Sequence, residues 1–104
     1  MQLEDLPQQV DRWIRQNGDY WDSFQILARL TEELGEIAGA LQRIGGLRPR
    51  KPEADLELEM GDSLFTLTAF ANRNKIQLEQ AVRRAIEKYD QRNSADWQKT
   101  HHNS

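Results

Sequence analysis

The chain has 104 residues, a formal net charge of -3 and no cysteine. This length allows one domain with a modest core, while the excess of acid argues against binding to polymeric nucleic acid. The lack of cysteine excludes disulfides, thiolate zinc sites and a cysteine nucleophile. Since no segment has the pattern of a signal peptide or a membrane span, we expect a soluble, cytoplasmic protein that does not bind membranes.

Two helices are predicted in the first half of the chain. The first contains Leu6 and ends at Asn17-Gly18, because apolar residues recur at helical spacing around a proline suited to a first turn. The second follows Tyr20 and is long. Its apolar residues step by three and four along one narrow stripe, which ends at Gly45-Gly46.

Two further helices are predicted in the second half, from about Ala54 to Arg73 and from about Leu78 to Gln91. The segment LRPRKP before them holds two prolines and three cations, so we expect an exposed basic loop there. The tail from about residue 94 lacks periodicity and is expected to fray.

No segment alternates apolar and polar residues for long enough to indicate a strand. We therefore predict an all-α fold, in which residues 1–104 form a single domain resembling a four-helix bundle. The third helix has apolar residues on two arcs, one of which contains Leu58 and Phe65. Because so small a domain cannot cover both arcs, we expect one to pack on the second helix and the other on a partner chain.

A short motif occurs twice, as Glu33-Leu-Gly-Glu36 in the second helix and Glu59-Met-Gly-Asp62 in the third. Residues three apart on a helix project from neighbouring turns of one face, so two facing helices would bring four carboxylates together. Glu33 borders the apolar stripe and is expected to be more buried than Glu36. A single such motif is common on solvated helix faces, but the repeated pair beside apolar surface favours a site.

Converging carboxylates next to a core need a cation, because burying several like charges is costly. Ligands that are all oxygen atoms favour Mg²⁺, with Mn²⁺ as an alternative, and Mg²⁺ commonly binds substrate phosphates as well. A di-iron site would need Glu-x-x-His motifs, whereas His101 and His102 lie in the tail. The glycines at 35 and 61 are expected to allow close approach of the helices.

Two other features could contact a substrate. Trp21 precedes the second helix and either stacks on a base or belongs to the core beside Phe24. Arg48, Arg50 and Lys51 either form a solvated loop or swing over phosphates.

The sequence resembles the MazG-like nucleotide pyrophosphohydrolases, a family of all-α nucleoside triphosphate pyrophosphatases. The resemblance rests on TEELGE (Thr31 to Glu36) and EMGDSLF (Glu59 to Phe65), with Ala71-Asn72, LEQA (Leu78 to Ala81) and EKYDQRN (Glu87 to Asn93) in the same order. It implies an all-α fold, a homodimer or homotetramer, and Mg²⁺-dependent cleavage of nucleoside triphosphates between the α and β phosphates.

The resemblance also implies roles for individual residues. By position the metal-binding acids are Glu33, Glu36, Glu59 and Asp62. Glu32 either supports them or acts with Glu33 as the catalytic base. Lys88 and Arg92 correspond to phosphate-binding positions, although cations are also favoured at a helix C-terminus by its dipole. Asn72 corresponds to a polar position near the substrate, or caps its helix.

The expected function is therefore Mg²⁺-dependent hydrolysis of a nucleoside triphosphate to monophosphate and pyrophosphate, which would remove unwanted nucleotides. The identity of the nucleotide stays open, as do a diphosphate substrate and the related phosphoribosyl-ATP reaction. A rival hypothesis is a non-catalytic helical module that dimerises or binds a nucleotide as a regulator. The presence of all four carboxylates favours the enzyme.

Overall fold

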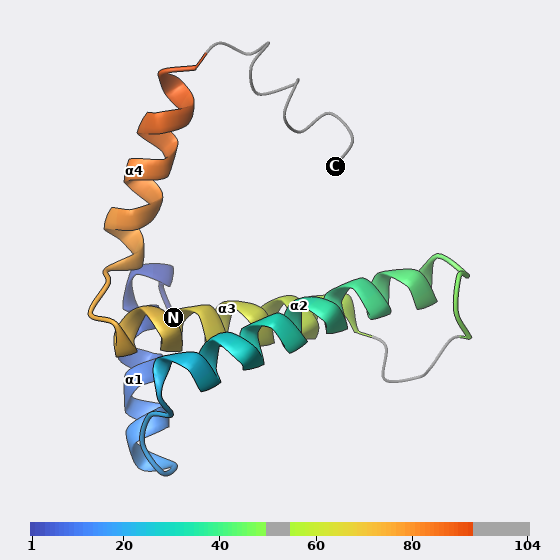
Figure 1. The fold of residues 1–104 in the computed structure, drawn as a ribbon, viewed down its shortest axis with the longest axis horizontal. Helices are drawn as coiled ribbons and strands as arrows, with labels where there is room; N and C mark the ends of the chain where they lie inside the picture. The colour runs from blue at the N-terminus through green and yellow to red at the C-terminus, as the bar shows by residue number, and fades with distance from the viewer. Residues whose placement is uncertain (50–54, 93–104) are drawn as a thin grey trace.

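The computed structural model describes residues 1–49 and 55–92 (Figure 1). Over this part of the chain every regular element is a helix, which confirms the all-α prediction. The elements are a short 3-10 helix, Leu3–Asp5, and four α-helices: α1 Leu6–Gln16, α2 Ser23–Ile44, α3 Leu56–Arg73 and α4 Leu78–Asp90.

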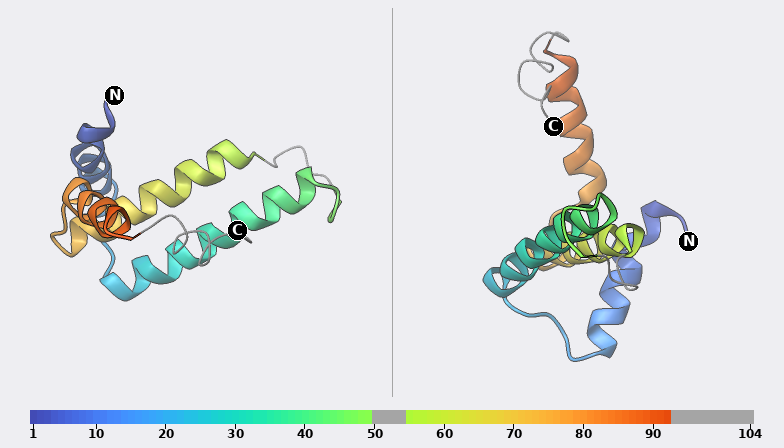
Figure 2. Two further views of the ribbon diagram at one scale, coloured as in Figure 1. Left: turned by 90° about the horizontal axis from the view of Figure 1, so that it is seen from above. Right: turned by 90° about the vertical axis from the view of Figure 1, so that its right-hand side faces the viewer.

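The two longest helices, α2 and α3, run antiparallel along most of their length, and α1 packs across one end of α3 (Figures 1 and 2). The core lies where the three helices meet. It consists of Val10, Ile14, Ile26 and Ala69, with Phe65 and other half-buried apolar side chains packed around it. Few large side chains are fully buried, so the fold leaves much apolar surface exposed.

The helix boundaries agree with the predictions to within a few residues, and side-chain caps explain the differences. The carboxylate of Asp22 accepts the backbone N–H of Gln25, whose side chain in turn accepts the N–H of Asp22, so α2 begins at Ser23. Asp55 accepts the N–H of Leu58 in the same way, and α3 therefore begins at Leu56.

The fourth helix extends away from the pair formed by α2 and α3 (Figure 1; Figure 2, right). None of its residues is buried, and Val82 and Ile86 are each 54% exposed. The Cα radius of gyration is 16.4 Å, whereas a compact domain of this size has about 13 Å. The apolar side of α4 thus has no cover within the described part of the chain.

The expected packing of α3 is wrong in one respect. Phe65 packs against the core, and its ring meets that of Trp13 edge to face with centroids 5.6 Å apart, so this arc packs on α1 rather than on a partner. The other arc is the one left open, since Met60 and Leu64 are exposed. Leu58, on the same arc as Phe65, is exposed, and its expected contact with a partner stays a prediction.

The reason given for the two motif glycines is also wrong within this chain. A Cβ atom built on Gly35 or Gly61 would meet no atom within 4 Å. Several small side chains of α3 are buried. The hydroxyls of Ser63, Thr66 and Thr68 are buried, and each donates to the carbonyl four residues earlier.

Candidate metal and nucleotide site

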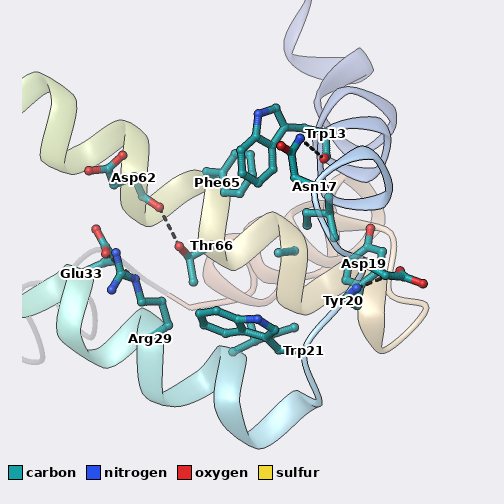
Figure 3. Close-up of a pocket in the computed structure, with 13 residues that line it drawn as sticks. Trp13, Asn17, Asp19, Tyr20, Trp21, Arg29, Glu33, Asp62, Phe65 and Thr66 are labelled. Atoms are coloured by element: carbon teal, nitrogen blue, oxygen red, sulfur yellow. Dashed lines mark hydrogen bonds and ion pairs between the residues drawn. The ribbon is translucent and has the colours of Figure 1, made fainter.

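Three of the four predicted acids converge between α2 and α3. Oxygen atoms from Glu33, Glu59 and Asp62 all lie within 4.8 Å of one another. Glu33 projects from α2 and Asp62 from α3 toward the same space (Figure 3). The motif spacing explains this arrangement, because the two helices are antiparallel neighbours and each presents its acidic turn to the other.

The acids differ in burial. The Glu33 side chain is only 7% exposed, Glu59 is half-buried, and Asp62 and Glu36 are exposed, so the expected order within the α2 pair is confirmed. Glu36 does not join the set within 4.8 Å. Its charge nonetheless acts on Glu59. The pKa of Glu59 is raised above its ordinary value, first by desolvation and then by repulsion from Glu36, Asp62, Glu33 and Asp55.

The buried Glu33 carboxylate has a partner on its own helix. Arg29 Nε lies 2.8 Å from Glu33 Oε1, and Arg29 Nη1 lies 3.5 Å from Glu32 Oε2. Glu32 is exposed. An unpaired buried carboxylate is costly, so Arg29 stabilises the metal-free arrangement.

A cavity of about 460 Å³ lies beside the acids, between α1, α2 and α3. Glu33 and Asp62 form part of its wall, and Trp13, Tyr20, Trp21 and Phe65 contribute aromatic rings (Figure 3). A volume of this size is typical of small-molecule sites, and such sites combine apolar walls with a few charged groups.

The connection between α1 and α2 brings two aromatic rings to this cavity. Gly18 and Asp19 both have positive φ, and the Asp19 N–H donates to the carbonyl of Ile14, so the chain turns sharply after α1. Tyr20 then donates its hydroxyl to Asp11 Oδ1 at 2.6 Å. Trp21 follows and is 57% exposed.

The alternative that placed Trp21 in the core is therefore wrong. Trp21 precedes the N-cap of α2, where its ring lines the cavity rather than the protein interior (Figure 3). Its ring is exposed on the wall of a cavity next to carboxylates, and the stacking role expected of it stays a prediction.

The remaining predicted substrate contacts lie elsewhere or outside the described residues. The Asn72 amide donates to the carbonyl of Pro7 at 3.0 Å and to the Tyr20 hydroxyl at 3.2 Å, and it does not line the cavity. Lys88 and Arg92 flank the ring of Tyr89 at the end of α4. Lys51 and Arg50 lie outside the described residues, so their predicted role is unchanged.

Sequence reasoning missed several residues of the cavity wall. Arg29 had an available signal, since it precedes Glu33 by four residues and the two side chains share one helix face. Trp13 on α1, Asn17 at the C-cap of α1 and Thr66 on α3 also line the cavity. Their convergence depends on how α1 crosses α3, which no local pattern predicts.

The fold and the cluster together define a class: an all-helical protein with a carboxylate site beside a cavity large enough for a nucleoside. The donor set fits a hard divalent cation, because all candidate ligands are carboxylate oxygens and their like charges crowd one another.

Comparison with known proteins agrees with this class. Residues 23–97 match the MazG nucleotide pyrophosphohydrolase domain. YpjD of Bacillus subtilis strain 168 is 38% identical over 99 residues, which cover 91% of this chain and 89% of YpjD. The chain belongs to the MazG nucleotide pyrophosphohydrolase family.

Two crystal structures share the fold. That of Bacillus subtilis YpjD, named as a candidate pyrophosphatase, is 39% identical with a TM-score of 0.75 and covers 86% of this chain and 95% of its own. A MazG protein conserved in Bacillus, named as a nucleotide pyrophosphohydrolase, is 32% identical with a TM-score of 0.75 over 91% of this chain and 96% of its own. The chain is accordingly a hydrolase that acts on nucleotides. Among the described helices, none is long and apolar enough to cross a membrane.

Proposed function

We propose that the protein hydrolyses a nucleoside triphosphate between the α and β phosphates, giving the monophosphate and pyrophosphate, with Mg²⁺ as cofactor and Mn²⁺ as a substitute. The observation that carries this proposal is the convergence of Glu33, Glu59 and Asp62 within 4.8 Å at the wall of a nucleoside-sized cavity. Family membership supports the reaction class.

Glu33, Glu59 and Asp62 hold the cation in this proposal, and Glu36 completes the set from the next turn of α2. A bound divalent cation supplies charge neutralisation for the phosphates and polarises the phosphorus under attack. The donor chemistry supports this assignment, since carboxylate oxygens without histidine or cysteine favour Mg²⁺ and Mn²⁺ over softer ions.

The protein's own contribution to hydrolysis is to orient the water and the substrate. Glu32 and Glu33 are the candidates for the base that takes a proton from the attacking water. Glu32 is exposed to solvent, whereas Glu33 is buried beside the other acids and is assigned to the cation, so Glu32 has the better access to the attacking water.

The cavity receives the nucleoside, with Trp21 stacked on the base. This placement sets the triphosphate over the acids, because Glu33 and Asp62 lie in the wall of the same cavity. The aromatic character of the wall suits any base, so the shape and the polar groups of the cavity determine which nucleotide is hydrolysed.

Four residues remain candidates for further contacts with the substrate: Lys51, Asn72, Lys88 and Arg92. Asn72 positions Tyr20, which precedes the stacking residue Trp21. Lys88 lies in the last turn of α4 and Arg92 just beyond its end, and this helix extends from the rest of the fold. They can reach phosphates only when α4 lies against an acidic cluster.

In this proposal the chains form a homo-oligomer, either a dimer or a tetramer, which covers the exposed apolar surface. Exposed apolar side chains follow helical spacing on each long helix: Leu27, Leu34 and Leu41 on α2, Met60, Leu64 and Leu67 on α3, and Val82 and Ile86 on α4. A second copy of the chain would bury these stripes and place α4 against neighbouring helices.

We place the enzyme in the cytoplasm, where it would remove surplus or modified nucleotides.

The test is a panel of canonical and modified nucleoside triphosphates, assayed with Mg²⁺ for release of pyrophosphate and of orthophosphate. At least one member should give pyrophosphate in stoichiometric amount. Glu59→Gln and Asp62→Asn should each abolish release, while the double variant His101→Ala with His102→Ala should keep it. Release of orthophosphate alone would contradict the proposed position of cleavage.

A further inference from the structure

Arg29 and a cation bound by the acidic cluster would compete for the same carboxylate, that of Glu33. The Glu33 side chain is 7% exposed and receives the Arg29 guanidinium at 2.8 Å, while it also converges with Glu59 and Asp62. A guanidinium and a divalent cation on one carboxylate repel each other. Occupation of the cluster by a cation therefore favours release of Arg29.

The helix itself does little to hold this ion pair. In the pairs Asp11–Arg15 and Glu79–Arg83 the acid precedes the base by four residues, which is the more favourable order on a helix. Arg29 precedes Glu33, which is the less favourable order. The pair therefore depends mainly on the burial of Glu33, and it weakens once that charge is neutralised in another way.

The cavity beside Glu33 gives the Arg29 side chain room to move away from that carboxylate. Its side chain is 53% exposed and lines the cavity near Trp21 (Figure 3). Its second contact, to the exposed Glu32 at 3.5 Å, is long for a charged hydrogen bond. A planar guanidinium that projects into a cavity beside a cation site matches the oxygen geometry of a phosphate group.

We infer that Arg29 is an exchangeable counterion: it neutralises Glu33 in the metal-free protein, is released when the acidic cluster takes a divalent cation, and then binds the substrate phosphates. This inference rests on the proposed function and adds a phosphate-binding residue to it. Removing Arg29 should therefore strengthen binding of the cation and weaken binding of phosphate. A purely structural ion pair would not shift the two affinities in opposite directions.

The first arm of the test measures Mn²⁺ binding by electron paramagnetic resonance of the free ion. Arg29→Met should bind Mn²⁺ about tenfold more tightly than the wild type, because the competing charge is gone. The matched control is Arg83→Met, which breaks an exposed pair of the same spacing on α4 and should leave the affinity unchanged. Equal or weaker Mn²⁺ binding by Arg29→Met would overturn the inference.

The second arm measures binding of inorganic pyrophosphate by calorimetry at saturating Mg²⁺. Arg29→Met should bind it about tenfold more weakly. Arg29→Lys keeps the charge without the planar fork, so it should show near-normal Mn²⁺ affinity with intermediate pyrophosphate affinity, and it serves if Arg29→Met does not fold. Unchanged pyrophosphate affinity in both variants would overturn the phosphate role.

Binding of Mn²⁺ by the wild type distinguishes a wrong metal site from a wrong role for Arg29. If the wild type binds no Mn²⁺, the proposed metal site is wrong, and the inference about Arg29 falls with it. If the wild type binds Mn²⁺ and releases pyrophosphate from a nucleotide while the Arg29 variants bind both probes normally, only the inference about Arg29 is wrong.

Discussion

Glu59 has the clearest electrostatic conflict at the scale of single residues. Desolvation and four neighbouring carboxylates raise its pKa above its ordinary value. A carboxyl whose pKa is higher in the folded than in the unfolded state stabilises the fold fully below the unfolded pKa. That contribution is lost as the pH rises through the folded pKa.

The metal-free protein should therefore gain stability when this charge is removed. We expect Glu59→Gln to raise the melting temperature in a chelator at neutral pH. The gain should shrink as the pH falls and vanish below 4.5, the ordinary pKa of the group. Scanning calorimetry across this range measures it.

Glu57→Gln is the control, because Glu57 is exposed in the first turn of α3 and its removal should slightly lower stability. A lower melting temperature for Glu59→Gln at neutral pH would mean that the cluster is not crowded.

Tyr20 ties the turn before α2 to both α1 and α3. Its hydroxyl donates to Asp11 and accepts from Asn72, and the bond to Tyr20 is the largest cause of the lowered pKa of Asp11. Tyr20→Phe should cost about 1 kcal/mol in the free energy of unfolding at neutral pH. Because a lowered carboxyl pKa stabilises the fold only above that pKa, the difference should shrink in acid. Denaturant titrations at several pH values test both points, and no loss at neutral pH would contradict them.

Some of the site could be predicted from single residues, and some could not. The convergence of Glu33, Glu59 and Asp62 follows from two spacings on helices that must pack together. The position of Trp21 in the cavity wall does not follow from any spacing, because it depends on the direction in which the chain leaves Gly18 and Asp19. Arg29 was missed because an ion pair at that spacing is common on exposed helices and becomes informative only once Glu33 is known to be buried.

At the scale of helices, the motif glycines give a sharp test. A Cβ on Gly35 or Gly61 meets nothing within 4 Å in the described part of this chain. Replacing either by alanine should raise the free energy of unfolding by about 1 kcal/mol, through helix propensity. Gly39→Ala is the comparison, because its Cβ would lie 3.1 Å from Arg43 Nη1 and the gain should be smaller. If Gly61→Ala is destabilising, a partner chain occupies that space.

The helices themselves were largely predictable, since strong apolar periodicity identifies all four. Their starting points were less so. The apolar residues Tyr20 and Trp21 could have belonged to α2, and only the Asp22–Gln25 capping box excludes them. The sequence contains the signal for this capping box, because Asp22 is followed three residues later by a glutamine.

At the scale of the whole molecule, the exposed apolar stripes determine the expected assembly. The double variant Met60→Glu with Leu64→Glu puts charge on the open arc of α3 and should dissociate the oligomer without unfolding the chain. Leu47→Glu changes an exposed leucine beyond α2 and should have no effect. Sedimentation equilibrium distinguishes the species. A wild type that is monomeric and fully active would contradict the proposed assembly.

A substitution of Phe65 tests whether this residue belongs to the core or to an interface. Because its ring packs on Trp13 and the core, Phe65→Glu should unfold the chain rather than merely dissociate it. Circular dichroism detects that loss. A folded monomeric Phe65→Glu would restore the original expectation that this arc faces a partner.

The placement of α4 is the part of the fold that sequence patterns could not supply. Its amphipathic pattern predicts a helix with one buried face, but not which surface covers it. In the described chain Val82 and Ile86 remain exposed, and the proposed second copy of the chain would cover them. Because α4 extends away from α2 and α3, Lys88 and Arg92 do not lie with the acids of their own chain.

In the proposed reaction, water attacks the α phosphorus of a nucleoside triphosphate held over Glu33, Glu59 and Asp62. Hydrolysis of an active triphosphate in ¹⁸O-labelled water, followed by ³¹P nuclear magnetic resonance of the products, tests it most directly. Attack at the α phosphorus should place the label in the nucleoside monophosphate and leave the pyrophosphate unlabelled. Label in the pyrophosphate, or formation of a diphosphate and orthophosphate, would contradict it.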